Sequence, residues 1–204
     1  TGEALTFSAT VTGAGNGAVN PTTDKKVTYK FYNNGEGDQL EGEALAKQPT
    51  GIGTYWVEAV YEGDDNYNGA TSDAEKFTIS PAALKVEATG YDAIYDGRKH
   101  DPVKSIKVTG VDEKLFTKDD YTISYAKKTD GQTDAPAADS GAWKTDTQVK
   151  DVADSGDYWI KVVIKDDDSY NAYIDSVNVD IDPKPLTVTK TVTLRKTYDG
   201  LSLI

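Results

Sequence analysis

The chain has 204 residues, a formal net charge of −12, no cysteine and no methionine. The acidic balance argues against nucleic-acid binding, which needs a basic surface, and the lack of cysteine excludes a disulfide framework and a cysteine nucleophile. No apolar run approaches the ~18 residues of a membrane span, so no membrane insertion is expected within this segment. Because methionine is missing even at position 1, we expect a piece of a longer or processed protein.

The predicted elements are almost all strands. Apolar and polar residues alternate at 27–31, 158–164 and 177–181, a period typical of strands with one buried face. Asn, Asp and Gly form turn signals between such runs, at 33–35, 62–66, 95–97, 129–131 and 139–141. Only residues 111–120 are compatible with a helical turn, so the sequence predicts an all-β chain.

The sequence also repeats itself at a spacing of about 100 residues. Residues 53–69 recur as 156–172 with eight of seventeen positions identical, residues 79–86 recur as 181–188, and Tyr95-Asp96-Gly97 recurs at 198–200. A unit of this size can bury its own core. With boundaries at the prolines that follow matched strands, we predict domains at 1–80 and 81–182. Residues 183–204 then form the first strand or strands of a truncated third repeat, or a donor strand.

A short motif before the repeated strand indicates the kind of sandwich. Asp154-Ser155-Gly156-Asp157-Tyr158 has the D-x-G-x-Y form that precedes strand F in immunoglobulin domains, where the tyrosine hydroxyl bonds to upstream backbone. Residues 51–55 keep the glycine and the tyrosine but lack the aspartate. The predicted fold is therefore tandem immunoglobulin-like β-sandwiches, with Tyr55 and Tyr158 facing the cores.

Several segments resemble bacterial Ig-like domain repeats of large Gram-positive cell-surface proteins. Residues 2–13, 27–32 and 53–72 look like one such domain, with the ending G-x-Y-x-V-x-A-x-Y-x-G-D-x-N-Y, and residues 90–102 resemble the start of a wall-anchored repeat. The resemblance implies a secreted protein with an extracellular location, at the bacterial cell surface or cell wall, in a stalk or adhesin. It does not imply one ligand, because fold does not fix function.

The residues do not predict an enzyme. The one histidine, His100, stands in a turn-like segment, and no nucleophile elbow, phosphate loop or zinc spacing is present. We expect no cofactor except calcium, which two acidic loops could bind through Asp64, Asp65, Asp167 and Asp168. The alternative is that these loops are polar hairpin turns.

Two matched tryptophans are the candidate ligand-binding residues. Trp56 and Trp159 fall on the face of their strands opposite the tyrosines, where an outward indole could stack on a glycan or a host protein. The alternative is that each tryptophan packs beneath neighbouring strand or linker residues.

The C-terminal segment is a candidate donor strand. Leu186, Val188, Val192 and Leu194 belong to a run rich in Thr, Val and Leu, which suits a strand. It would allow self-association through terminal strands, by β-strand addition to another molecule. The alternative is a tail held by its own chain. An isopeptide cross-link between Lys85 and Asn178 is disfavoured, since both occupy the polar phase of their strands.

The leading functional hypothesis is a non-catalytic structural or stalk segment of a bacterial cell-surface adhesin. The first alternative is a filament subunit linked by donor-strand exchange through the C-terminal tail. The second is a carbohydrate- or host-protein-binding module.

Overall fold

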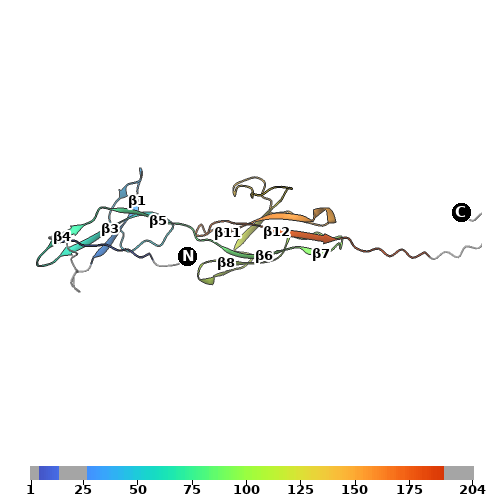
Figure 1. Cartoon of the computed structure of the whole chain (residues 1–204), viewed down its shortest axis with the longest axis horizontal. Coiled ribbons are helices and arrows are strands. Elements are labelled where there is room, and N and C mark those ends of the chain that lie inside the picture. Colours follow the sequence, from blue (N-terminus) through green and yellow to red (C-terminus); the bar gives the residue numbers. More distant parts are fainter. Residues whose placement is uncertain (1–4, 14–26, 191–204) are drawn as a thin grey trace, which may run out of the picture.

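The computed structural model describes residues 5–13 and 27–190. Its strands fall into two groups that share no sheet, one formed by β1 to β5 and one by β6 to β12. We call them the first and second units. The two units follow one another along the long axis of the molecule (Figure 1). The prediction of an all-β chain is confirmed, while the domain boundaries stay predictions.

The first unit is built on one antiparallel sheet. Its strands are β1 (Thr28–Asn34), β2 (Leu40–Glu41), β3 (Gly53–Gly63), β4 (Asn68–Thr71) and β5 (Glu75–Ile79). β1 and β5 flank the long central strand β3. Phe7 lies against one face of this sheet, with its ring 5.3 Å from Phe31 and 5.4 Å from Phe77 between centroids. This aromatic cluster is the core of the described first unit.

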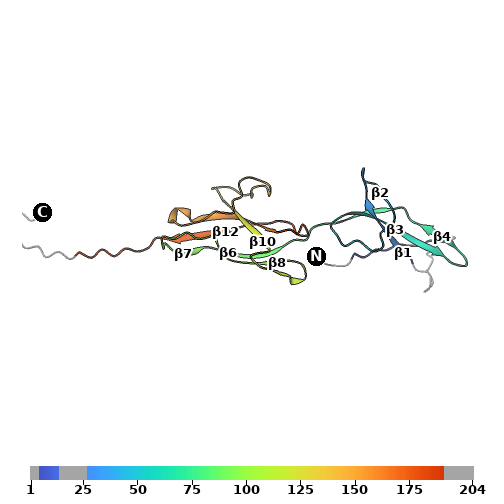
Figure 2. The same ribbon diagram turned by 180° about the vertical axis from the view of Figure 1, so that it is seen from behind.

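The second unit is a sandwich of two sheets. The larger sheet runs β10-β11-β12-β7 and the smaller one β6-β8-β9. The strands are β6 (Lys85–Gly90), β7 (Asp92–Ile94), β8 (Val103–Thr109), β9 (Leu115–Phe116), β10 (Tyr121–Lys127), β11 (Gly156–Ile164) and β12 (Tyr173–Asp182). Both views show the two sheets facing each other (Figures 1 and 2).

The core of the sandwich follows the predicted alternation. Tyr158, Ile160 and Val162 point inward from β11, at 3%, 1% and 0% exposure. Val162 packs in one cluster with Val108 of the opposite sheet, whereas Tyr158 and Ile160 belong to a second cluster. The helical turn expected within 111–120 is a short 3-10 helix, η2 (Val111–Glu113). A second, η3 (Val152–Asp154), has no counterpart in the sequence predictions.

The sequence predicted turns at 129–131 and 139–141, but not that they belong to one long connection between β10 and β11. Residues 128–155 contain no strand, and apart from η3 they form turns and isolated bridges. In both views part of this connection rises on the side of the larger sheet that faces away from β6 and β8 (Figures 1 and 2). We call residues 128–147 the covering loop.

Among the described residues, no helix is long and apolar enough to cross a membrane.

Candidate functional site

The tyrosine corner is formed as the D-x-G-x-Y motif predicts. Tyr158 is 3% exposed, and its hydroxyl donates to the backbone oxygen of Asp154 at 2.9 Å. In the first unit the hydroxyl of Tyr55 donates to the oxygen of Gly51 at 3.1 Å. Both tyrosines are therefore structural, and they fix the phase of the tryptophans beside them.

Trp159 lies on the opposite face from Tyr158, as expected, but its predicted exposure is wrong. Its side chain is buried, with 9% exposure, beside Ala126 on β10, which is equally buried. The ammonium of Lys128, from the covering loop, lies 4.8 Å from the centre of the Trp159 ring. A buried indole with a loop side chain over its ring matches the alternative that Trp159 packs beneath its neighbours.

The covering loop is held on the sheet by contacts with β11. Lys161 donates to the oxygen of Ala138 at 2.7 Å, and its ammonium lies 5.1 Å from the Trp143 ring. The Trp143 indole in turn donates to the oxygen of Ala137 at 2.8 Å. In the described part of the chain, Trp159 Nε1 is the one buried side-chain nitrogen or oxygen without a hydrogen-bond partner.

Trp56 has a different setting, because the described residues of the first unit include no strandless connection as long as residues 128–147. It is half-buried between Tyr32 of β1 and Lys76 of β5, its partners in the sheet register. Its indole donates to Asn34 Oδ1 at 2.9 Å. Lys76 forms an ion pair with Asp38. The part of this face around Trp56 is an open, polar surface with two neighbouring aromatic rings, and ligand binding there stays a prediction.

The acidic loops use their carboxylates within their own turns. Asp64 Oδ1 accepts hydrogen bonds from the amides of Asn66 and Tyr67 at 2.8 and 2.9 Å, and Asp64 also accepts the hydroxyl of Tyr61. In the second loop Asp167 accepts the amide of Ser169 at 2.9 Å. These contacts fit the hairpin-turn alternative.

The other two candidate calcium ligands, Asp65 and Asp168, are exposed. Within residues 5–13 and 27–190, no group of three or more His, Asp or Glu side chains is placed to hold a metal ion. Calcium binding at the four aspartates remains an untested prediction.

His100 takes part in a turn. Its Nε2 lies 3.1 Å from Asp96 Oδ1, and its ring stacks on Tyr91 with centroids 4.3 Å apart. Its backbone bridges to Val149. The amide of Arg98 and the imidazole of His100 both bond to Asp96, which lowers the pKa of that carboxyl.

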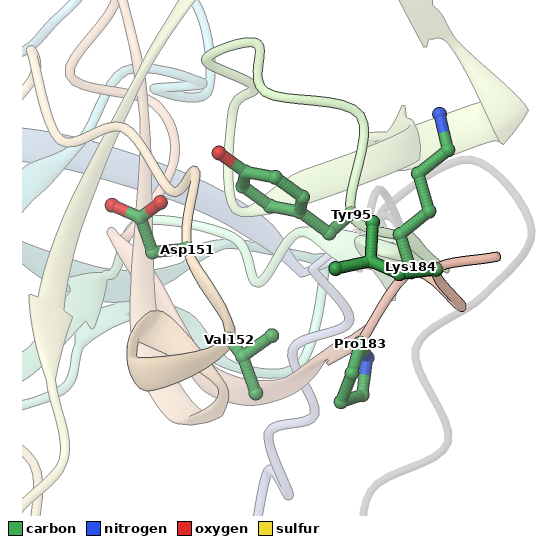
Figure 3. Close-up of a pocket in the computed structure, with 6 residues that line it drawn as sticks. Tyr95, Asp151, Val152, Pro183 and Lys184 are labelled. Carbon is green, nitrogen blue, oxygen red and sulfur yellow. The ribbon is translucent and has the colours of Figure 1, made fainter. Parts of the chain in front are cut away.

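The C-terminal segment leaves the second unit beside a hollow of about 410 Å³. Figure 3 shows Asp151 and Val152 on one side of it and Pro183 and Lys184 on the other, with Tyr95 between them. Leu186 completes the lining. Leu186 and Val188 are nevertheless 90% and 93% exposed. The other two donor-strand candidates, Val192 and Leu194, lie outside the described residues.

Lys85 and Asn178, the two candidates for an isopeptide cross-link, are exposed, and each contacts a different acidic residue. Lys85 lies 3.4 Å from Glu87, and Asn178 donates to Asp157 at 3.0 Å.

Comparison with known proteins gives little beyond the fold. The sequence matches no protein-family model and no curated protein. Solved structures align with it at low identity and low score, and three of them are as follows. The first holds three N-terminal domains of the bacteriophage RB49 Highly Immunogenic Outer Capsid protein, at 18% identity and a TM-score of 0.33, covering 81% of this chain and 52% of that chain. The chain thus spans about half the length of that structure.

The second holds fibronectin(III)-like modules of Clostridium thermocellum CbhA, at 18% identity and a TM-score of 0.29, covering 84% of this chain and 87% of that chain. The third holds the four N-terminal Ig domains of Dscam1 isoform 6.9, at 15% identity and a TM-score of 0.27, covering 78% and 38%. The second and third structures thus consist of fibronectin(III)-like modules and Ig domains, respectively.

Proposed function

We propose that this chain is a non-catalytic stalk segment of a bacterial cell-surface protein, located outside the cell, which holds a more distal part away from the surface. A stalk needs units that are stable and junctions that resist bending. The observation that carries the proposal is the way the connection between the two units is bonded into the second unit.

The connection at Pro81 and Ala82 is held by the loop between β11 and β12. The amide of Ala82 donates to the oxygen of Ser169 at 2.8 Å, and the amide of Asn171 donates back to the oxygen of Ala82 at 2.9 Å. The side chain of Asn171 adds a third hydrogen bond, to the oxygen of Pro81 at 3.1 Å. Proline also restricts the backbone at this point. The junction is therefore tied to the second unit by a parallel β-bridge between Ala82 and Tyr170, and it is not a free linker.

The arrangement of the units supports the same function. β4 lies at one end of the long axis, and residues 183–190 leave from the other end (Figures 1 and 2). Two units that follow one another along one axis span distance efficiently.

The test measures how widely the angle between the units varies. Since the chain has no cysteine, Lys30→Cys and Asp180→Cys place one fluorophore on each unit, at exposed strand positions. We expect a single narrow transfer-efficiency distribution by single-molecule energy transfer. Asn171→Ala removes one hydrogen bond, worth about 1 kcal/mol, so bent states should become about fivefold more populated.

The matched control is Asn68→Ala. Asn68 occupies the equivalent place in the repeat, but it lies in β4, at the far end of the first unit (Figure 1). It should leave the distribution unchanged. A broad distribution of transfer efficiencies in the unmodified protein would refute the proposed stalk function.

A second candidate function is self-association through the C-terminal segment. Leu186 and Val188 occupy the repeat positions of Leu84 and Val86, and Leu84 is 8% exposed whereas Leu186 is 90% exposed. A strand-forming sequence with bare apolar side chains favours strand addition. Size-exclusion chromatography at high concentration should show polymers that disappear on truncation after Pro183. Monomers before and after truncation would exclude this function.

A third candidate is ligand binding at the face around Trp56. The half-buried rings of Tyr32 and Trp56 are neighbours on an uncovered part of the sheet, a surface on which a sugar ring or a partner protein could stack. Screening on a glycan and host-protein array tests this. Any hit should be lost in Trp56→Ala and kept in Trp143→Ala.

A further inference from the structure

The sandwich of the second unit has a gap in its smaller sheet. β8 is paired along one edge with β6, from Val103 to Thr109. On its other edge, β9 pairs only with Val108 and Thr109. At the start of β8, His100 bridges to Val149. Between these contacts, residues 103–107 have no strand partner on that edge in the described chain.

A groove of about 520 Å³ lies along this free edge, between β8 and β10. Its floor is apolar: Ile106 and Ile123 are half-buried, and Phe116 is buried. Leu115 is 61% exposed at one lip of the groove. The facing strand β10 is also an edge strand, and its only outer partner in the described chain is Lys144, which bridges to Tyr125. An unpaired edge above an apolar floor is the arrangement that β-augmentation uses.

Two tyrosine hydroxyls in the groove lack partners. Tyr121 and Tyr125 line it and are 6% and 3% exposed, yet in the described residues neither hydroxyl makes a hydrogen bond. Neither hydroxyl oxygen is fully buried, because among the described residues Trp159 Nε1 is the one fully buried side-chain nitrogen or oxygen without a hydrogen-bond partner. The hydroxyls are thus open to the groove. Burial raises the pKa of Tyr121, and burial, followed by the nearby charge of Asp101, raises the pKa of Tyr125 to about 12. Both hydroxyls therefore keep their proton and can donate as well as accept.

The rim of the groove is basic, although the chain as a whole is acidic. The charged residues that line the groove are Lys104, Lys107 and Lys118, with one carboxylate, Asp101. Lys104 donates to the backbone oxygen of Asp92 at 3.0 Å. Lys107 and Lys118 are exposed, and neither takes part in an ion pair within the described chain. In a protein with a net charge of −12, this local excess of positive charge selects an anionic partner.

We propose that this groove, which we call the β8–β10 groove, binds a short extended segment of a partner protein in which apolar residues alternate with acidic ones. The segment adds to the free edge of β8, its apolar side chains meet Ile106 and Ile123, and its carboxylates meet Lys107 and Lys118. Five free edge residues correspond to roughly 17 Å of strand. The two end contacts of β8 limit the added strand to about that length.

The C-terminal segment of a second copy is a poor occupant for this groove. Residues 183–190 include Lys184 and Lys190 and no acidic residue, so its charge repels the rim. The groove is therefore distinct from the self-association considered above, and its partner is a different protein.

The experiment uses a labelled, blocked seven-residue peptide in which valine alternates with glutamate, and a matched peptide in which lysine replaces glutamate. We expect saturable binding of the glutamate peptide by fluorescence anisotropy and weaker or no binding of the lysine peptide. Amide hydrogen exchange at residues 103–107 should slow when the glutamate peptide is bound, because a new strand protects these amides.

Two charge-matched double variants locate the site. Lys107→Glu with Lys118→Glu should weaken binding of the glutamate peptide about tenfold. Lys47→Glu with Lys99→Glu changes the net charge equally at exposed positions outside the groove and should have no comparable effect. Tyr125→Phe, which keeps the ring, should weaken binding by a smaller factor.

Four results would overturn the proposal: no saturable binding, equal binding of both peptides, equal loss in both double variants, or protection that falls outside β8. Concentration-dependent dimers that Lys107→Glu with Lys118→Glu abolishes would also overturn it, since they would assign the groove to a second copy of this chain.

Discussion

At the residue scale, the tyrosine corner connects a sequence motif to a measurable contribution to the free energy of unfolding. Tyr158 is a core residue whose one polar atom is satisfied by the backbone of Asp154. The sequence predicted this bond because D-x-G-x-Y sets the distance along the chain between hydroxyl and carbonyl. The side chain of Asp154 was not assigned a role. It accepts the amides of Lys150 and Asp151 at 2.8 and 2.9 Å, a contact that depends on the unpredicted η3.

We expect Tyr158→Phe to lower the free energy of unfolding by about 1 kcal/mol, the usual net contribution of one hydrogen bond. The carbonyl of Asp154 loses its shorter hydrogen bond and keeps only the 3.5 Å bond from Lys127 Nζ, while the ring keeps its packing. Denaturant titration followed by circular dichroism measures the change. The matched variant Tyr55→Phe removes a longer, exposed bond and should cost less. Equal costs would contradict the importance of burial at this corner.

The amides that bond to Asp154 also predict a pH dependence. They lower the pKa of this carboxyl from its ordinary value of 3.8, so the ionised form is favoured in the folded state. The resulting stabilisation is present above pH 3.8 and is lost as the pH falls through the lower folded-state pKa.

Asp154→Asn should therefore show a smaller loss of stability than the unmodified protein when thermal melts are taken at decreasing pH below 3.8. Asp168→Asn, in an exposed loop, is the control with the same change of charge. If both variants follow the same acid profile, Asp154 does not contribute the effect.

At the element scale, strand alternation decided which face is core but not what covers the other face. Trp56 and Trp159 are equivalent in the repeat and both lie opposite a tyrosine, yet among the described residues Trp159 is buried and Trp56 is half-buried. The difference comes from the loop at 128–147, which contains no periodic pattern and was not recognised in the sequence. Its contacts with Lys161 and Trp159 join residues that are about 20 to 30 positions apart, which local reasoning does not detect.

A glycine shows how closely two elements approach. A Cβ built on Gly90, at the end of β6, would lie 1.7 Å from the backbone oxygen of Asn178 in β12. Gly90→Ala forces these strands apart, and we expect a loss of about 2 kcal/mol or more in unfolding free energy.

Gly141→Ala is the control, since a Cβ there meets nothing within 4 Å and should change stability by less than about 0.5 kcal/mol. Thermal melts of both variants make the comparison. A Gly90→Ala protein as stable as the unmodified one would mean that β6 and β12 are not held at this distance.

At the scale of the whole molecule, the two units differ in how much they bury. In the described first unit the buried apolar residues are Phe31 and Tyr61, at 7% and 4% exposure, whereas the second unit buries two clusters that span both sheets. Burial of apolar area is the main source of stability. The two units should therefore open with different free energies.

We expect hydrogen exchange by mass spectrometry to be faster in β3 than in β11, although the two strands are matched in the repeat. Peptides covering residues 55–61 and 158–164 give the direct comparison. The experiment needs only the unmodified protein. Equal protection of these peptides would show that the units unfold together.

The sequence by itself determined the all-β class, the faces of the main strands, the tyrosine corner and the similarity of the two repeated segments. Each of these depends on residues close in the chain or on a period of two, which any strand must express. Only the tertiary structure decided that Trp159 is covered, that Ser169 and Asn171 hold the connection between the units, and that, within the described residues, β8 keeps a free edge beside a basic rim. These features depend on where distant segments meet, and on a partner strand that is missing along one edge, which no local pattern encodes.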